Sequence, residues 1–229
     1  MDITRFPSPN LLPFLEKEDL RQTPKAFIGC SDLTTVLTYL TGRCGIVSFH
    51  GPMLDRRLSR GIDAYDRASF VGALTSTEPL GELGAAQLET FNKGEAAGPL
   101  MGGTLVQLLA SLGTPYAFDP PNGHILFLED VGERPFRLDR MVTQLRLAGV
   151  LERASAIVLG DFVDCDEPGG AIAAKTVLAN LLKDFNGPVV HGFPSGHTRG
   201  PLVTLPFGVR ARVVANGDPR VIIEEAGVE

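Results

Sequence analysis

A serine stands where a short apolar run gives way to a helical pattern. Residues 26–28 predict a short buried strand, and apolar residues at 33–40 recur at helical spacing. Ser31 therefore falls at a strand-to-helix junction, where backbone N–H groups without helical partners can stabilise negative charge on a substrate oxygen. On this segment alone, Ser31 and Asp32 are more simply explained as caps of the helix, and a nucleophilic serine is the alternative that the rest of the chain must support.

A serine hydroxyl is a weak nucleophile, so it needs a base to remove its proton and a third group to orient that base. The chain has four histidines. His50, His124 and His191 lie beside strand runs or a turn, and we expect structural roles for them. His197 lies in a glycine- and proline-rich segment, a loop that can present an imidazole from a scaffold, and it is the candidate base.

Acidic residues gather in two places. Glu129 and Asp130 end the apolar run 125–128, and a carboxylate is rarely placed at the end of a buried strand for solubility, so they are candidates for the orienting group. Four more acids surround Cys165 at 161–167, without histidine partners or a recognisable ligand spacing. We expect a solvated loop there; a metal site and a contact to a cationic substrate group are the alternatives.

Six segments, taken in order, carry a family pattern. They are 28–34, 50–53, 98–105, 125–131, 139–141 and 196–198, which read IGCSDLT, HGPM, GPLMGGTL, ILFLEDV, DRM and GHT. Together they resemble the LD-carboxypeptidases of serine peptidase family S66, over nearly the whole chain from about residue 11 to residue 214. The resemblance implies a Ser31 nucleophile, a Glu129 triad acid and a His197 general base.

The same resemblance implies the activity. Family members cleave the amide between an L-configured centre and a C-terminal D-amino acid, typically the terminal D-alanine of murein tetrapeptides in peptidoglycan recycling. The backbone N–H of Asp32 would help to form the oxyanion site while its carboxylate braces the turn, and Gly103 and Thr104 would contact the substrate. The resemblance implies no cofactor and no metal, a murein peptide as partner, and a homodimer.

Three features depart from the family pattern. Family members carry a substantial segment before the nucleophile turn, with a glycine-rich stretch near the active site, which residues 1–13 do not match. Cys30 stands where tyrosine is usual; its thiol is an alternative nucleophile, although a residue one step from the turn points elsewhere. Thr104 stands where asparagine is common, and its shorter hydroxyl leaves room for a different substrate preference.

Composition narrows the class of protein. The net charge of −6, without a run of lysines or arginines, argues against nucleic acid as a partner. Three cysteines without paired spacing favour a reducing compartment. The start does not read as a signal peptide and no apolar run is long enough to cross a bilayer, so we expect a cytoplasmic protein with no membrane partner.

Apolar strand runs alternate with helical patterns, which predicts an α/β fold. We expect a truncated N-terminal parallel-sheet lobe with the nucleophile turn at 1–75, a linker at 76–97, and a C-terminal α/β lobe with a β-rich end at 98–229. Within the first lobe, 54–74 predicts a polar helical stretch. Near the end, β-branched runs broken at 207–208 and 216–218 predict a hairpin.

Two classes of function stay open. The first is an active serine carboxypeptidase. Within it, the competitor is the microcin-immunity branch, which cleaves aminoacyl-nucleotide conjugates and usually adds aromatic residues to hold the base; the chain has no tryptophan, which favours the murein substrate. The second class is an inactive remnant with a binding role, which the unmatched N-terminal segment suggests.

Overall fold

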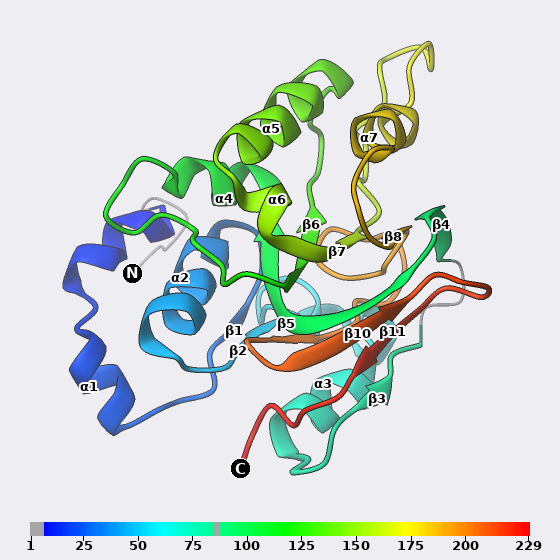
Figure 1. The fold of residues 1–229 in the computed structure, drawn as a ribbon. Coiled ribbons are helices and arrows are strands. Elements are labelled where there is room, and N and C mark those ends of the chain that lie inside the picture. The colour runs from blue at the N-terminus through cyan, green and yellow to red at the C-terminus, as the bar shows by residue number, and fades with distance from the viewer. Residues whose placement is uncertain (1–6, 85–87) are drawn as a thin grey trace.

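The computed structural model of the chain describes residues 7–84 and 88–229, and in these ranges the strands form two sheets (Figure 1). The smaller sheet has the order β1-β2-β9 and the larger one the order β3-β11-β10-β5-β6-β7-β8-β4. The strands are β1 (Ile28–Gly29), β2 (Ser48–His50), β3 (Gly81–Glu82), β4 (Glu89–Asn92), β5 (Glu95–Thr104), β6 (His124–Glu129), β7 (Ala154–Leu159), β8 (Val189–His191), β9 (Leu205–Phe207), β10 (Arg210–Val214) and β11 (Arg220–Ile223). The helices are α1 (Lys17–Gln22), α2 (Thr34–Tyr39), α3 (Arg67–Thr75), α4 (Leu105–Ser111), α5 (Pro135–Leu147), α6 (Val150–Arg153) and α7 (Ala174–Leu182).

The centre of the larger sheet is parallel. β5, β6, β7 and β8 run in the same direction, and antiparallel strands flank them on both sides. Every residue of β6 is buried, as expected for a parallel strand covered on both faces. The apolar runs at 125–128, 156–159 and 189–190 therefore form the strands that their composition predicts.

Side chains of β6 alternate between two apolar cores. Leu126 and Leu128 pack in the core beneath α4, α5 and α7, which lie above the strands in Figure 1. Ile125 and Phe127 belong to the other core, which also contains Phe207 of β9. Because alternate residues share a face, Glu129 follows Ile125 and Phe127 and turns its carboxylate towards the smaller sheet.

The smaller sheet positions the Ser31 turn. β1 and β2 are parallel with Gly29 opposite His50, and β9 pairs antiparallel with β2 so that His50 also faces Leu205. β9 comes from the C-terminal part of the chain, so segments far apart in the sequence build this sheet together. The strand before Ser31 is therefore held by β2 from the N-terminal part of the chain and, through β2, by β9 from the C-terminal part.

The α/β fold class is confirmed, and β10 with β11 forms the predicted C-terminal hairpin. Residues 76–97 are not free of regular structure: β3 and β4 pair with the larger sheet, and β5 begins at Glu95. The helical stretch predicted at 54–74 is wrong in its first half. Short 3-10 turns lie there, and Gly61 has a φ of 96°, so α3 begins only at Arg67. Within the described residues no helix is long and apolar enough to cross a membrane.

Candidate active site

The Ser31 turn is strained. Ser31 has a φ of 58°, in the left-handed region that residues other than glycine seldom adopt, and it opens a 3-10 helix (Ser31–Leu33) that leads into α2. Gly29 leaves room for Leu33 to pack against the strand, since a Cβ there would lie 2.4 Å from Leu33 Cδ1 and 3.1 Å from Leu33 Cβ. A strained serine between a strand and a helix has the geometry of a nucleophile elbow, a sharp turn that exposes the serine hydroxyl.

Glu129 is fully buried and accepts two hydrogen bonds from the His197 loop. Its Oε2 accepts hydrogen bonds from the backbone N–H of His197 at 2.9 Å and from His197 Nδ1 at 2.8 Å. Glycines leave room for the carboxylate, because a Cβ on Gly196 would lie 2.5 Å from Glu129 Cδ and one on Gly160 would lie 2.7 Å from Glu129 Cβ. A carboxylate only accepts, so Nδ1 of His197 carries the proton and Nε2 is left to act as a base.

The two partners shift each other's ionisation. Burial alone would lower the pKa of His197, but the hydrogen bond and charge of Glu129 outweigh it and the pKa lies above its ordinary value. Burial alone would raise the pKa of Glu129, but the hydrogen bond and charge of His197 outweigh it and the pKa is lowered. His197 keeps 27% of its side chain exposed, so a basic imidazole on a buried carboxylate faces solvent.

Two connections bring the Ser31 turn to Glu129. The backbone N–H of Thr104 donates to Thr34 Oγ1 at 3.1 Å, and Thr104 lies opposite Glu129 in the pairing of β5 with β6. His50, paired with Gly29, has its Nε2 4.0 Å from Glu129 Oε1. In the described part of the chain no hydrogen bond joins the Ser31 hydroxyl to His197; in substrate-free sites such bonds often tighten only in the substrate complex.

The remaining expected site residues support these three. The carboxylate of Asp32 accepts a hydrogen bond from the backbone N–H of Ser8 at 2.7 Å, and so braces the turn. Thr104 is buried and donates its hydroxyl to Glu129 Oε1. Gly103 allows β5 to approach α2, since a Cβ there would lie 2.5 Å from Thr34 Cγ2. Substrate contacts by Gly103 and Thr104 stay predictions.

The loop beyond His197 is anchored by Arg57, which the sequence patterns did not single out, and by Asp161 of the acidic segment 161–167. Arg57 donates from Nη1 to the carbonyl of Gly200 at 2.9 Å and from Nη2 to that of Thr198. The hydroxyl of Thr198 donates to Asp161 Oδ2 at 2.5 Å. A guanidinium that bonds only to backbone carbonyls leaves no mark in residue spacing, so only the fold reveals it.

Cys30 and Asp130 are held out of the chemistry. Cys30 is buried, and burial together with the charge of Glu129 raises its pKa to about 12, which keeps it a thiol and removes it as a competing nucleophile. Asp130 turns away from Glu129 and accepts hydrogen bonds from the backbone N–H groups of Val106 and Val131, both at 2.9 Å. Of the two acids that end the strand, only Glu129 contacts His197.

The acids around Cys165 each have a different partner. Asp161 bonds Thr198, Asp164 pairs with Arg199, Asp166 accepts from the N–H of Ala174, and Glu167 pairs with Arg134. In residues 7–84 and 88–229, no group of three or more histidine, cysteine or acidic side chains is placed to hold a metal ion. Pairing with protein groups accounts for this acidic loop.

Family models match both halves of this arrangement. The model of the LD-carboxypeptidase N-terminal domain matches residues 6–51, and that of the LD-carboxypeptidase C-terminal domain matches residues 97–213. The chain belongs to the LD-carboxypeptidase family. Ser31 falls in the first match, and Glu129 and His197 fall in the second.

Individual members resemble the chain over most of its length. The probable murein peptide carboxypeptidase of Bacillus subtilis is 34% identical over 214 residues, which are 91% of this chain and 65% of that protein. A muramoyltetrapeptide carboxypeptidase structure from Oxalobacter formigenes superposes with a TM-score of 0.81 at 32% identity, covering 96% of this chain and 75% of that one. The microcin C7 self-immunity protein MccF superposes with a TM-score of 0.84 at 27% identity, covering 97% and 74%.

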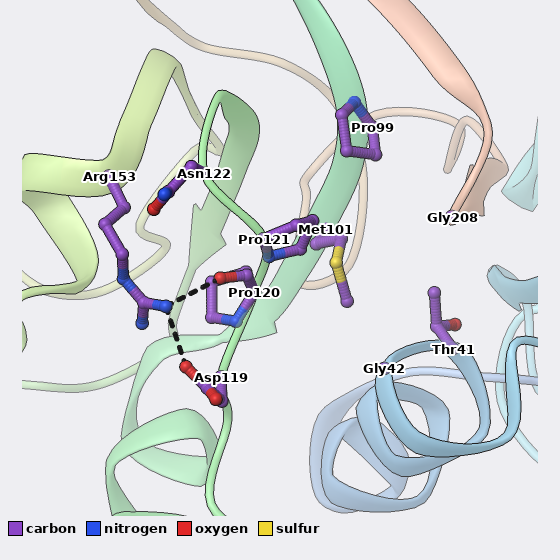
Figure 2. Close-up of a pocket in the computed structure, with 10 residues that line it drawn as sticks. All are labelled: Thr41, Gly42, Pro99, Met101, Asp119, Pro120, Pro121, Asn122, Arg153 and Gly208. Carbon is purple, nitrogen blue, oxygen red and sulfur yellow. Dashed lines mark hydrogen bonds and ion pairs between the residues drawn. The ribbon is translucent and has the colours of Figure 1, made fainter.

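A cavity of about 490 Å³ lies at the other end of β6 (Figure 2). Met101 and the loop 119–122, which precedes β6, line it, and Arg153 reaches across to Asp119 at 2.7 Å and to the carbonyl of Pro120 at 2.9 Å. Glu129 and His197, the candidate triad residues in contact, lie at the carboxyl end of β6, where parallel sheets place their sites, and Thr104 links the Ser31 turn to the same end. The candidate active site is therefore at that end.

Proposed function

We propose that the protein is a serine LD-carboxypeptidase that removes the C-terminal D-alanine of murein tetrapeptides in peptidoglycan recycling. The observation that carries the proposal is the pair formed by buried Glu129 and the part-exposed His197, beside a serine in a strained strand-to-helix turn. The family membership and the names of the relatives that act on murein peptides agree with it.

In the proposed mechanism, Ser31 attacks the carbonyl carbon of the amide that joins the L-configured centre of the third residue to D-alanine. His197 Nε2 takes the hydroxyl proton as the new C–O bond forms. Glu129 stabilises the imidazolium that results, since its negative charge lies 2.8 Å from Nδ1. The N–H of Asp32, in the first turn of the 3-10 helix, is the proposed donor to the oxyanion.

Collapse of the tetrahedral intermediate breaks the C–N bond. His197 gives its proton to the departing amine, so free D-alanine leaves and the tripeptide stays as an ester on Ser31. A water molecule then enters, His197 removes one of its protons, and the ester is hydrolysed to regenerate the serine. The exposed side of His197 serves both steps, because the departing amine and the entering water approach the same nitrogen.

A second candidate is the reaction class of MccF, whose fold superposes with the TM-score of 0.84 given above. The same triad would act on an aminoacyl-nucleotide conjugate, and only the leaving group would differ. The two candidates differ in the site that the leaving group requires. A nucleobase requires aromatic side chains around it, and D-alanine requires a small pocket.

The test is a comparison of three substrates with purified protein. We expect release of D-alanine from L-alanyl-γ-D-glutamyl-meso-diaminopimelyl-D-alanine, none from the same peptide ending in L-alanine, and no cleavage of an aspartyl sulfamoyl adenosine. Cleavage of only the nucleoside conjugate would replace the proposal with the second candidate. Well-folded protein that cleaves none of them would favour the inactive remnant.

A further inference from the structure

His50 is a buried imidazole that the proposed chemistry does not use. It is fully buried at the end of β2 and packs against two rings, with its centroid 5.2 Å from that of Phe127 and 5.5 Å from that of Phe207. Its register partners are Gly29, two residues before Ser31, and Leu205 of β9. The imidazole therefore sits where the nucleophile's strand meets the larger sheet.

Ser195 determines which nitrogen of His50 carries the proton. The hydroxyl of Ser195 donates its single hydrogen to the carbonyl of Val203 at 2.7 Å, and it also lies 3.1 Å from His50 Nδ1. Because the Ser195 hydroxyl already donates its only hydrogen to the Val203 carbonyl, it can only accept a hydrogen bond from His50. The proton between Ser195 Oγ and His50 therefore belongs to Nδ1. A neutral His50 then has an unprotonated Nε2.

That unprotonated nitrogen faces the triad acid. His50 Nε2 lies 4.0 Å from Glu129 Oε1 and has no hydrogen-bond partner among the described residues. An unpartnered polar atom in a fully buried position costs stability, and such exceptions in native structures call for an explanation. Ser195 is only two residues before His197, so His50 touches the surroundings of all three triad members.

We propose that His50 is a positioning residue of the triad: held as the Nδ1–H tautomer by Ser195, it ties the strand before Ser31 to the loop of His197 and turns an unprotonated nitrogen towards Glu129. The hydrogen bond between His50 and Ser195 holds strands β1 and β2, which precede and support Ser31, at a fixed distance from the loop that carries His197. The unprotonated nitrogen donates nothing to Glu129, whose hydrogen bonds come from His197 and Thr104.

The charge state of His50 fits this role. The titratable groups that act on it are Glu129 from β6 and His197 from the loop after β8. Burial outweighs the attraction of Glu129 and lowers the pKa of His50 to about 4, so it stays neutral while His197 titrates above its ordinary value.

The catalytic part of this inference rests on the proposed function, and the tautomer does not. Nitrogen chemical shifts of the histidines in the Ser31→Ala protein report the tautomer without any turnover. We expect His50 to show a protonated Nδ1 and an unprotonated Nε2, and the Ser195→Ala variant to lose this preference. A proton on Nε2 in the protein with Ser195 intact would overturn the proposal, whatever the substrate.

The catalytic part is tested by D-alanine release from the murein tetrapeptide. His50→Phe fills the space without a hydrogen bond, and we expect kcat to fall about 100-fold with KM nearly unchanged, as for a misplacement of about 1 Å. His50→Asn keeps a donor near the position of Nδ1 and should recover most of that loss. Wild-type kcat in His50→Phe, or no recovery in His50→Asn, would overturn the positioning role.

His124 provides the matched control. It is also fully buried, its Nδ1 bonds the carbonyl of Pro121 at 2.9 Å, and its Nε2 has no partner in the described residues, but it lies at the opposite end of β6. His124→Phe should lower the melting temperature about as much as His50→Phe and leave kcat unchanged. An equal loss of kcat in both variants would show a general effect of destabilisation and overturn the inference.

Discussion

The two ends of β6 are equally buried but built in opposite ways. At the carboxyl end, Glu129 receives hydrogen bonds from Thr104 and His197, and these residues come from distant parts of the chain. At the amino end, His124 bonds the carbonyl of Pro121 three residues away, and Arg153 bonds Asp119 at the rim of the far cavity. The carboxyl end gathers side-chain hydrogen bonds around a buried carboxylate, and the amino end has a local bond to a carbonyl and an exposed ion pair.

The difference separates function from fold maintenance. A buried carboxylate that binds a part-exposed imidazole costs solvation free energy, and a strained serine costs backbone free energy; the proposed chemistry accounts for both together. At the amino end, His124 is as deeply buried as Glu129, but no strained serine lies beside it in the described residues. Substitutions at the two ends should therefore affect different measurements.

Among the substitutions that compare the two ends of β6, Glu129→Gln should have the largest effect on catalysis. The amide keeps the size of the side chain but loses the charge that stabilises the His197 imidazolium, so we expect kcat for D-alanine release to fall by about 10⁴-fold. Asp119→Asn is the control at the other end, where the carboxylate is 59% exposed in its pair with Arg153. It should leave kcat unchanged and alter the free energy of unfolding by less than about 1 kcal/mol. A comparable loss of kcat in both variants would erase the distinction between the ends.

Gly103→Ala and Gly123→Ala compare glycines near the two ends of the strand pair. Both have positive φ, at 140° and 78°, but a Cβ on Gly103 would lie 2.5 Å from Thr34 Cγ2 while none of the atoms around Gly123 comes within 4 Å. We expect a loss of about 3 kcal/mol in the free energy of unfolding at Gly103 and about 1 kcal/mol at Gly123. Urea denaturation measures both free energies of unfolding. Equal losses would mean that α2 can move away from the new Cβ at residue 103 without loss of stability.

The activity should depend on the protonation of His197. Only the neutral imidazole accepts the serine proton, and its pKa is raised above 6.5 by the hydrogen bond and charge of Glu129, which outweigh burial. The acid limb of kcat/KM should therefore have its midpoint above pH 6.5. A midpoint below pH 6 in the wild-type protein would show that Glu129 does not hold the imidazole as described.

The stability should respond to pH through His124, whose pKa is shifted in the opposite direction to that of His197. Burial lowers its pKa to about 4 in the folded state, against 6.5 when unfolded. The folded form is favoured above pH 6.5, and this contribution is lost as the pH falls from 6.5 towards 4, because the unfolded chain binds the proton more tightly. His124→Gln should flatten this part of the unfolding free energy against pH; an unchanged slope would mean that His124 binds its proton equally tightly in the folded and unfolded states.

Local patterns were sufficient for some of the elements and for nominating candidate site residues. The apolar run before Glu129 and the strand-to-helix junction at Ser31 are contiguous features, so strand, helix and candidate residue follow from one segment each. The glycine-rich loop around His197 is contiguous too. The prediction of a helix at 54–74 failed because the φ of 96° at Gly61 interrupts it, and composition alone does not show this.

Long-range contacts were beyond the sequence. His50 was expected to be structural, and its place beside Glu129 depends on pairing between β1, β2 and β9. Arg57 holds the loop of His197 through backbone carbonyls, which are the same in every residue type. The strands at 81–82 and 89–92 were missed because they are short and polar, and the pairing with β11 and β8 defines them.

The most direct test of the account is the initial rate of D-alanine release from the murein tetrapeptide by the wild-type protein and by Ser31→Ala, with circular dichroism to show that both are folded. We expect measurable release by the wild type and a loss on the order of 10⁶-fold in the variant. Release by folded Ser31→Ala at the wild-type rate would contradict the assignment of Ser31 as the nucleophile.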